Sequence, residues 1–230
     1  MTTATLLDTV RGLLVNDLDA YTGSDVQDTE ILPVVNLAQR DIARKTLYYN
    51  PMQTVTASVT DTHKLNMETA TGIVEPIYEP IKVWYGSSMT SVAIITMAEL
   101  DRKAPSWRLS YTTSTSPAYA VVKEPELWFY GQIPATNAIY IHGLVYPADI
   151  TLTGGSPVGP SLASDLHFAV ALRSAIRLSA PLIGEGEAIR RVGTYWNEMK
   201  QLITRHYNKN FADLYDDGTV PSDYGRYQSF

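Results

Sequence analysis

Cysteine is absent from the 230-residue sequence, and acidic residues outnumber basic ones by 24 to 18. Without cysteine, neither disulfides nor thiolate-bound metal ions can form. The formal net charge of -6 argues against tight DNA binding, which needs clustered Lys and Arg, although DNA can pass nearby without adhering. No run approaches the ~18 apolar residues of a membrane span. The start, Met1-Thr2-Thr3-Ala4, lacks the basic and apolar regions of a signal peptide. We therefore expect a soluble protein that binds no membrane and is made in a cytoplasm.

Side-chain groups that could catalyse a reaction or hold a cofactor are also missing. The four histidines are too far apart in sequence for a local metal site: His63, His142, His167 and His206. His167 and His206 fall in one helical region and could meet, but a core or interface role is favoured. Gly184-Glu185-Gly186 lacks the preceding strand and third glycine of a dinucleotide-binding loop. Asp216-Asp217-Gly218 lacks the later glutamate of a calcium loop. The sequence therefore predicts a protein that is not an enzyme and has no cofactor or metal.

Two amphipathic helices are predicted near the N-terminus. Apolar residues repeat at helical spacing over residues 4–18. A second helix is expected over residues 25–47, preceded by Ser24 and Gln27 at the spacing of a capping box. Pro33 falls inside that range, so the regular helix either begins close to this proline or bends there.

Two more helices are predicted over residues 161–207. The first is apolar over more than half of its circumference, which is typical of a buried helix. We expect Pro181 to end it, because the ring blocks further helical hydrogen bonding, and Gly184 to relieve the turn. The second carries an apolar stripe from Ile189 to Ile203. Each helix pair has a stripe to bury, so the N-terminal and C-terminal pairs are predicted to pack as one bundle.

Between the helical pairs the period of apolar residues changes from 3.6 to 2. Val55, Ala57 and Val59 alternate with polar residues. Further strand candidates follow over residues 73–78, 81–85, 92–96, 107–113, 118–123, 126–130 and 138–146, with a short helix over 97–103. The clearest pairing is a hairpin of 126–130 with 138–142. Short strands without helical crossovers predict an antiparallel sandwich or small barrel.

The predicted fold class is therefore α+β, with an antiparallel β-sandwich or barrel inserted into an antiparallel helical bundle. Residues 1–50 and 161–207 form the bundle, residues 51–150 the β domain, and the Gly/Pro-rich residues 151–160 a linker. Residues 208–230 lack a period. Disordered tails are normally poor in aromatic residues, whereas this segment is rich in them. We therefore interpret this segment as an extended arm that becomes ordered on a partner, with folding back onto its own subunit as the alternative.

Three stretches carry a resemblance to a known family. They are LAQRDIA at 37–43 after Ser24-Asp25, LWFYGQIPA at 127–135 before the strand 138–146, and the helix 165–178 with its successor through Tyr195-Trp196. In this order, with the β insert and the aromatic tail, the chain resembles the head-to-tail adaptor (head-completion or connector) proteins of tailed bacteriophages. Pro33 departs from the usual pattern of that family's second helix.

The resemblance implies a structural protein of the virion neck, made in the host cytoplasm. It implies a homo-oligomeric ring, typically of twelve copies, between the portal protein and a tail nozzle or tail-tube protein. Helical parts would face the portal and the β part the tail, and DNA would pass through the channel non-specifically. A closed ring uses a heterologous interface, for which a broadly apolar helix has surface to spare. We expect acidic side chains such as Asp8, Asp17 and Asp41 to keep DNA from adhering.

The resemblance also suggests roles for individual residues. The C-terminal segment of such proteins commonly reaches along the portal. The predicted portal-binding arm therefore includes Tyr215, Tyr224, Arg226, Tyr227 and Phe230. The residues expected to pack in the bundle or between subunits are Leu166, Val170, Trp196 and Met199.

The alternative function is that of a carbohydrate- or surface-binding β module of a virion or tail protein. Four aromatic side chains could stack on sugars, although core packing is favoured for them: Trp84, Tyr85, Trp107 and Trp128.

Overall fold

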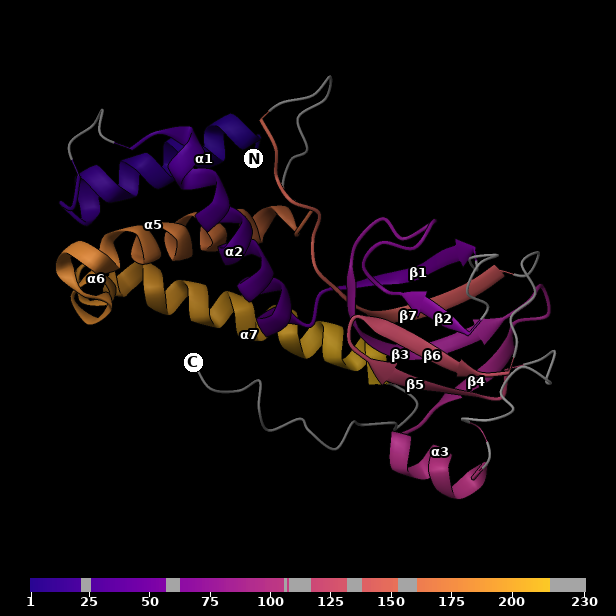
Figure 1. Ribbon diagram of the computed structural model, residues 1–230. Helices are drawn as coiled ribbons and strands as arrows, with labels where there is room; N and C mark the ends of the chain where they lie inside the picture. Colours follow the sequence, from indigo (N-terminus) through magenta and orange to yellow (C-terminus); the bar gives the residue numbers. More distant parts are fainter. Residues whose placement is uncertain are drawn as a thin grey trace. The chain divides into compact units, whose positions relative to one another are not determined.

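The computed structural model describes residues 1–21, 26–56, 63–105, 107, 117–131, 138–152 and 161–215. The chain divides into two compact units. One combines Met1–Tyr48 with Pro147–Phe230, and the other is Tyr49–Tyr146. Helices make up the described part of the first, here called the helical unit, and a sheet dominates the second, the β unit (Figure 1). The α+β class predicted from the sequence is confirmed.

Five α-helices form the helical unit within the described residues. They are α1 (Thr3–Gly12), α2 (Asp28–Thr46), α5 (His167–Ile183), α6 (Glu185–Arg191) and α7 (Gly193–Tyr215). A π-helical turn, η1 (Leu13–Asp17), continues α1, and a 3-10 turn, η2 (Ser164–Leu166), precedes α5. The helices predicted over 4–18 and 25–47 are confirmed, with the start of the second at Asp28.

Segments from both ends of the chain share one hydrophobic core. Leu14 of η1, Val35 of α2 and Leu172 of α5 are all fully buried in it. Among the described residues, the stretch Ser164–Ile183 alone has the length and hydropathy that crossing a membrane requires, and 56% of that window is buried. Since the apolar side chains of α5 fill this core, packing inside the helical unit accounts for the high hydropathy of the stretch Ser164–Ile183.

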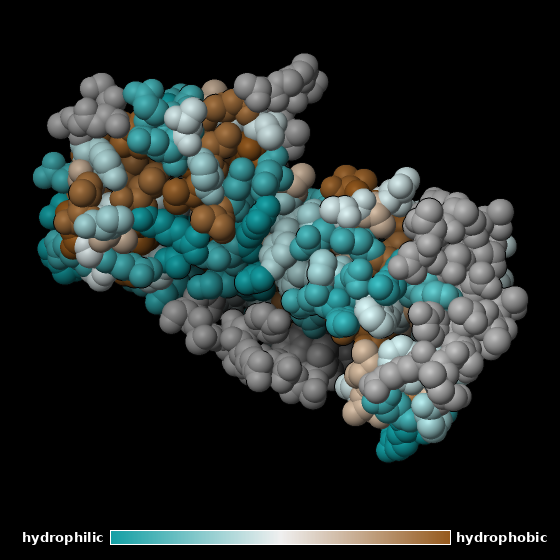
Figure 2. All heavy atoms as spheres, in the orientation of Figure 1, coloured by the Kyte–Doolittle hydropathy of each residue, from teal (hydrophilic) through white to brown (hydrophobic). Residues whose placement is uncertain are grey.

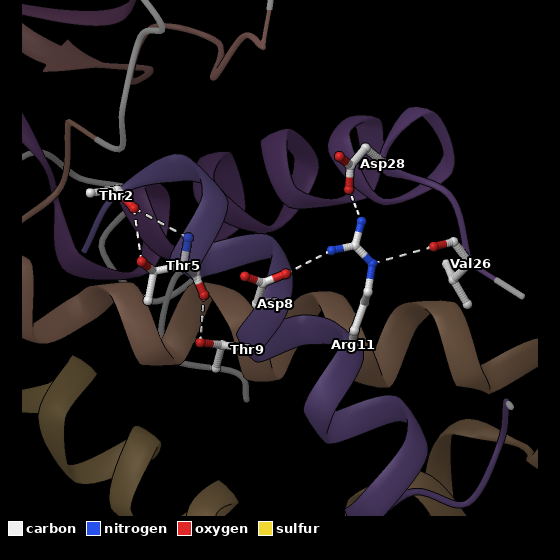
Figure 3. A network of polar contacts seen from close by, with 7 residues as sticks. All are labelled: Thr2, Thr5, Asp8, Thr9, Arg11, Val26 and Asp28. Carbon is white, nitrogen blue, oxygen red and sulfur yellow. Dashed lines mark hydrogen bonds and ion pairs between the residues drawn. The ribbon is translucent and has the colours of Figure 1, made fainter. Parts of the chain in front are cut away.

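The start of α2 differs from the prediction. Gln27 is the N-cap, and its backbone N–H donates to Glu30 Oε2 at 3.2 Å in a capping box. Ser24, the predicted cap, lies outside the described residues. Arg11 of α1 holds this start in place: it forms an ion pair with Asp28, and its Nε donates to the Val26 carbonyl at 3.4 Å (Figure 3).

Both helical prolines lie inside helices. Pro33 lies in the second turn of α2. Because proline has no backbone N–H, the carbonyl four residues earlier lacks its helical hydrogen bond, but that carbonyl lies in an exposed turn. The prediction that Pro181 ends its helix is wrong. It lies in the last turn of α5, where a proline removes only one hydrogen bond, and Gly184 ends the helix with φ 83°.

The last predicted helix is in fact two helices. Val192, with φ -100° and ψ 25°, separates α6 from α7. Helix α7 then runs to Tyr215, so residues 208–215 are helical and not extended as predicted. The aromatic rings of Tyr207 and Phe211 stack at 6.0 Å on successive turns of α7, and Leu214 is buried. Residues 216–230 lie outside the described part of the chain.

Within the described residues of the β unit, seven strands form one curled mixed sheet, a half-barrel (Figure 1). They are β1 (Tyr49–Thr56), β2 (Lys64–Asn66), β3 (Ile77–Tyr85), β4 (Thr90–Ile94), β5 (Tyr119–Lys123), β6 (Glu126–Tyr130) and β7 (Ala138–Val145). Their order in the sheet is β1-β7-β3-β4-β5-β6-β2. The predicted short helix is confirmed as α3 (Met97–Lys103), which starts at a capping box formed by Thr96 and Glu99.

Two predictions about the sheet are wrong. The strand 126–130 does not pair with 138–142. Instead, β6 forms a hairpin with β5 across Glu124-Pro125, while β7 lies between β1 and β3. The sheet is also not purely antiparallel, because β4 and β5 run parallel. The connection between these two strands contains α3 and is long enough for the crossover that a parallel pair needs.

Other strand boundaries also differ from those predicted. Strand β3 contains the end of candidate 73–78 and all of 81–85, residues 73–76 are not in a strand, and β2 was not predicted. Residues 57–59 and most of 107–113 lie outside the described residues. Trp107, the first residue of the latter candidate, is helical and not extended, and its backbone N–H donates to the Ala104 carbonyl at 2.9 Å.

Candidate functional site

The residues predicted to pack in the bundle or between subunits lie mainly inside the chain. Leu166, Val170 and Met199 are 2%, 0% and 5% exposed in the core of the helical unit. Trp196 packs against the same core but is only half-buried. Trp196 is therefore the one member of this set that also reaches the surface.

Charged side chains gather beside Trp196, where α2, α5 and α7 pack together. Arg177 of α5 forms an ion pair with Asp41 of α2. Arg173, one turn earlier, places Nε 3.6 Å from Asp41 Oδ2 and Nη1 2.9 Å from Glu185 Oε1. These side chains are 19% to 30% exposed, except for Glu185 at 56%, so water screens the inner pairs only partly.

Lys200 and Lys45 complete this group of charged residues. The Arg173 guanidinium and Lys200 Nζ lie 5.9 Å and 5.6 Å from the ring centre of Trp196. Burial lowers the pKa of Lys45, and the positive charges of Arg173, Arg177 and Lys200 lower it further, while Asp41 opposes them. The cation cluster is defined as Lys45, Arg173, Arg177 and Lys200.

The spacing of charged residues in the sequence indicates part of this cluster. Asp41 and Lys45 are four residues apart, as are Arg173 and Arg177, so each pair shares a helix face. Spacing could not show that the two faces meet, because 128 residues separate Lys45 from Arg173.

A groove of about 340 Å³ lies between the α1–η1 segment and the first turns of α5 and α7. Its lining residues are Thr9, Gly12, Leu13, Asn16, Asp17, Phe168 and Tyr195. The rings of Phe168 and Tyr195 meet edge to face at 5.6 Å, and Tyr195 is 39% exposed. Asp17 is the only charged lining residue, so we call this hollow the acidic groove. Part of its wall is the π-helical turn, a feature frequent at functional sites.

A second hollow, of about 310 Å³, lies on the outer face of α2. It is lined by Leu32, Pro33, Asn36, Leu37, Arg40 and Asp149. Leu37 is 50% exposed, and Arg40 Nη2 donates to Asp149 Oδ1 at 2.9 Å.

Figure 2 shows apolar side chains exposed among polar ones over the helices on the face in view.

The three aspartates expected to repel DNA differ in their surroundings. Asp8 pairs with Arg11 at 2.8 Å (Figure 3), and Asp41 is held by Arg177. Asp17 lies in the acidic groove. The positive partners offset the negative charges of Asp8 and Asp41, whereas Asp17 has no such ion pair with another described residue.

Arg190 and Arg191 of α6 both form ion pairs with Glu187 one turn earlier. Arg190 Nε and Arg191 Nε donate to the Glu187 carboxylate at 2.7 Å and 2.9 Å. These hydrogen bonds lower the pKa of Glu187 to about 2. Arg191 also donates to the Leu18 carbonyl, which ties α6 to the segment after η1.

The histidines form no common site in the described residues. His167 Nε2 lies 2.8 Å from the Leu162 carbonyl oxygen, whereas His206 Nε2 lies 2.8 Å from Asp165 Oδ2. The His206 contact lowers the pKa of Asp165. Burial, with a contribution from Lys82, lowers the pKa of His142. No three His, Asp or Glu side chains gather as metal ligands in the part of the chain that the structure describes.

Of the four aromatic residues considered for sugar stacking, Tyr85, Trp107 and Trp128 are buried or in ring contacts within the β unit, and Trp84 is half-buried. Tyr85 and Trp107 are 8% and 7% exposed. Trp107 meets Trp128 edge to face at 6.5 Å, and the ammonium groups of Lys64 and Lys123 lie 4.7 Å and 4.4 Å from the Trp128 ring centre. A sugar would have to displace these cations to stack on Trp128.

The predicted arm residues lie at or beyond the end of α7. Tyr215 is the last helical residue. Tyr224, Arg226, Tyr227 and Phe230 lie outside the described residues.

Comparison with known proteins identifies the family. The family model for the SU10 adaptor protein matches residues 1–217. None of the curated proteins matches the chain. The match spans 217 of the 230 residues and confirms the resemblance expected from the sequence. The chain therefore belongs to the SU10 adaptor protein family, and it is a structural head-tail adaptor of a bacteriophage.

Proposed function

We propose that this adaptor assembles into a ring, of twelve copies, between the portal protein and a tail nozzle or tail-tube protein in the virion neck. The observation that carries this proposal is the family match over residues 1–217. The helical unit would face the portal and the β unit the tail, as the resemblance implies. Apolar side chains that are 39% to 58% exposed on the helical unit support subunit contacts: Leu37, Leu182 and Tyr195.

The ring would let DNA pass without holding it. The net charge of -6 supports this role, because an acidic protein repels phosphates at distances up to about 10 Å at 0.1 M salt. A structural role of this kind involves no catalysis, and the protein would be made in the host cytoplasm before joining the virion.

The C-terminal segment would attach the ring to the portal, with Tyr215, Tyr224, Arg226, Tyr227 and Phe230 as contacts. Aromatic side chains and arginine are the residue types that most often dominate binding energy at interfaces. The family match ends at residue 217, so most of this segment lies beyond the shared part of the chain. That is the pattern expected if the segment is adapted to its own portal.

The experiment that tests the ring is imaging of the purified protein mixed with portal rings. We expect one closed adaptor ring on each portal, and copies that never join the portal would contradict the proposal.

The arm is tested by two variants. Deletion of residues 216–230 should leave the melting temperature unchanged and abolish portal attachment. Replacement of Tyr224, Tyr227 and Phe230 by Ala keeps the length of the segment and should have the same effect. Loss of folding after the deletion would place the segment in the subunit's own core.

A further inference from the structure

We propose that helix α2 anchors both chain connections between the two units, and that this double attachment limits how far the β unit can turn. The chain crosses between the units twice, at Tyr48–Tyr49 and at Tyr146–Pro147. The first connection continues α2, and polar side chains of α2 hold the second, residues 147–150. We call these side chains the α2 clamp and define it as Asn36, Gln39 and Arg40.

The α2 clamp holds the backbone of the second connection. Asn36 lies three and four positions before Gln39 and Arg40, so all three share a face of α2. Asn36 binds both backbone groups of Ile150: its Nδ2 donates to the carbonyl at 3.2 Å, and its Oδ1 accepts from the N–H at 2.8 Å. Gln39 Nε2 donates to the Ala148 carbonyl at 3.0 Å. These three hydrogen bonds engage the main chain, so they fix the path of the connection.

Burial decides which contacts of the α2 clamp contribute most. Gln39 is fully buried and Ile150 is 1% exposed in the core of the helical unit, so water competes little for their hydrogen bonds. Arg40 Nη2 lies 2.9 Å and 3.1 Å from the carboxylate oxygens of Asp149, but these side chains are 42% and 50% exposed. Exposed ion pairs contribute little to stability. The amide hydrogen bonds and the burial of Ile150 therefore hold the connection on α2.

Gln39 is an unfavourable residue for this buried position if stability alone is considered. A buried amide loses its hydration, and the hydrogen bond to Ala148 offsets that loss. An apolar side chain of similar volume, such as methionine, would avoid the loss altogether. The amide therefore indicates that the role of Gln39 is to hold the connection in place.

The first connection leaves α2 without a flexible spacer. Leu47, the C-cap, is 1% exposed, and the Tyr48 N–H donates to the Ala43 carbonyl at 2.9 Å at the end of the helix. The Tyr48 side chain packs against the core of the helical unit. Strand β1 begins at the next residue, Tyr49. The backbone is therefore held by the helical unit up to the residue at which the β unit starts.

Two anchored connections restrict turning that a single one would allow. Tyr49 in β1 pairs with Leu144 in β7, so the connections leave the β unit from neighbouring strands. On α2 they are attached at Asn36 and Thr46, ten residues apart, a rise of about 15 Å along the helix. Motion between rigid parts is absorbed at a few loop residues, and the α2 clamp removes residues 148–150 from that role. If the ring forms as proposed, each copy then carries its β unit with little freedom to turn, which lowers the entropy lost on assembly.

Spin labels measure the freedom of the β unit, because the chain has no native cysteine that would also be labelled. One label is placed at Asn197→Cys in α7 and the other at Ser91→Cys in β4, both at exposed positions. Double electron–electron resonance on the full chain gives the distribution of distances between the labels. Combining Asn36→Ala with Gln39→Met removes the three backbone hydrogen bonds of the α2 clamp and should widen this distribution.

Amide hydrogen exchange shows whether the α2 clamp has been released. In the double variant the Ile150 N–H should exchange at least about tenfold faster, because it loses its acceptor. Asn208→Ala makes the same amide-to-alanine change at an exposed site of α7 and should alter neither the exchange rate nor the distance distribution. Circular dichroism and thermal unfolding confirm the fold. If the double variant does not fold, Asn36→Ala alone is measured by the same criteria.

Three results would overturn the inference. The first is a wild-type distance distribution as wide as that of the folded variant. The second is faster exchange at Ile150 without any widening, because the α2 clamp would then act only locally. The third is unchanged exchange at Ile150, which would show that Asn36 does not hold it in solution. All of these measurements use the chain alone, so copies that never join portal rings would refute the proposed function and leave this test unaffected.

Discussion

Leu172→Ala should reveal how strongly the N-terminal and C-terminal helices depend on each other. Leu172 is fully buried in α5, in the core that also contains residues of α1, η1 and α2. The substitution removes three carbon atoms from a site that α5 alone cannot close, so both the lost transfer energy and the remaining cavity destabilise the fold.

The expected cost follows from this burial. A fully buried leucine replaced by alanine costs about 2–5 kcal/mol. For a chain of this length, each kcal/mol lowers the melting temperature by roughly 2–4 °C, so a fall of roughly 4–20 °C is expected. Differential scanning calorimetry, with urea unfolding followed by circular dichroism, measures both quantities. If the two units unfold separately, only the helical unit's transition should move.

Leu182→Ala is the matched control, because Leu182 lies in the same helix and is 58% exposed. It should change stability by less than about 0.5 kcal/mol. Equal shifts for the two variants, or no shift for Leu172→Ala, would refute the shared core.

Three other changes have defined outcomes. Gly143→Ala should destabilise the β unit and disturb the pairing of β3 with β7, because its Cβ would lie 2.5 Å from a backbone oxygen of β3; Gly186→Ala meets nothing within 4 Å and serves as its control in thermal unfolding. Glu187 should titrate near pH 2 by carboxyl-carbon NMR, since its hydrogen bonds lower the pKa from 4.5. The stabilisation is thus present above pH 4.5 and is lost as the pH falls toward 2. Arg190→Ala should move the titration upward, and an unchanged midpoint would show that the pair does not form in solution. Trp196→Ala should cost about 1–3 kcal/mol in urea unfolding, below the 3–5 kcal/mol typical of a fully buried tryptophan, because its side chain is half-buried.

Helices and the α+β class were predictable because their signals are local. The apolar spacing over residues 4–18 depends on neighbours three and four positions away. The short helix 97–103 likewise has its capping box within its own first turn. Pro181 was overrated as a helix terminator, since it lies inside α5, and Pro33 did not delay the start of α2 to its own position.

Strand pairing was not predictable from the same signals. The strands 126–130 and 138–145 are both rich in apolar and aromatic residues, and this composition does not specify a partner. The pairing of β6 with β5 brings a tight turn at Glu124-Pro125, and the pairing of β7 with β3 depends on Gly143. These choices depend on contacts between residues far apart in the chain.

The sequence by itself determined the helices, the insertion of strands between them and the resemblance to phage adaptors, because spacing along the chain encodes all three. Only the tertiary structure showed that Asp41, Arg173 and Lys200 form one charged surface beside Trp196. It also separated Tyr195, in the acidic groove, from Trp196, although the two are adjacent in sequence. The physical reason is that helix packing brings together residues more than 100 positions apart, and the rotation of a helix sends adjacent side chains to different surfaces.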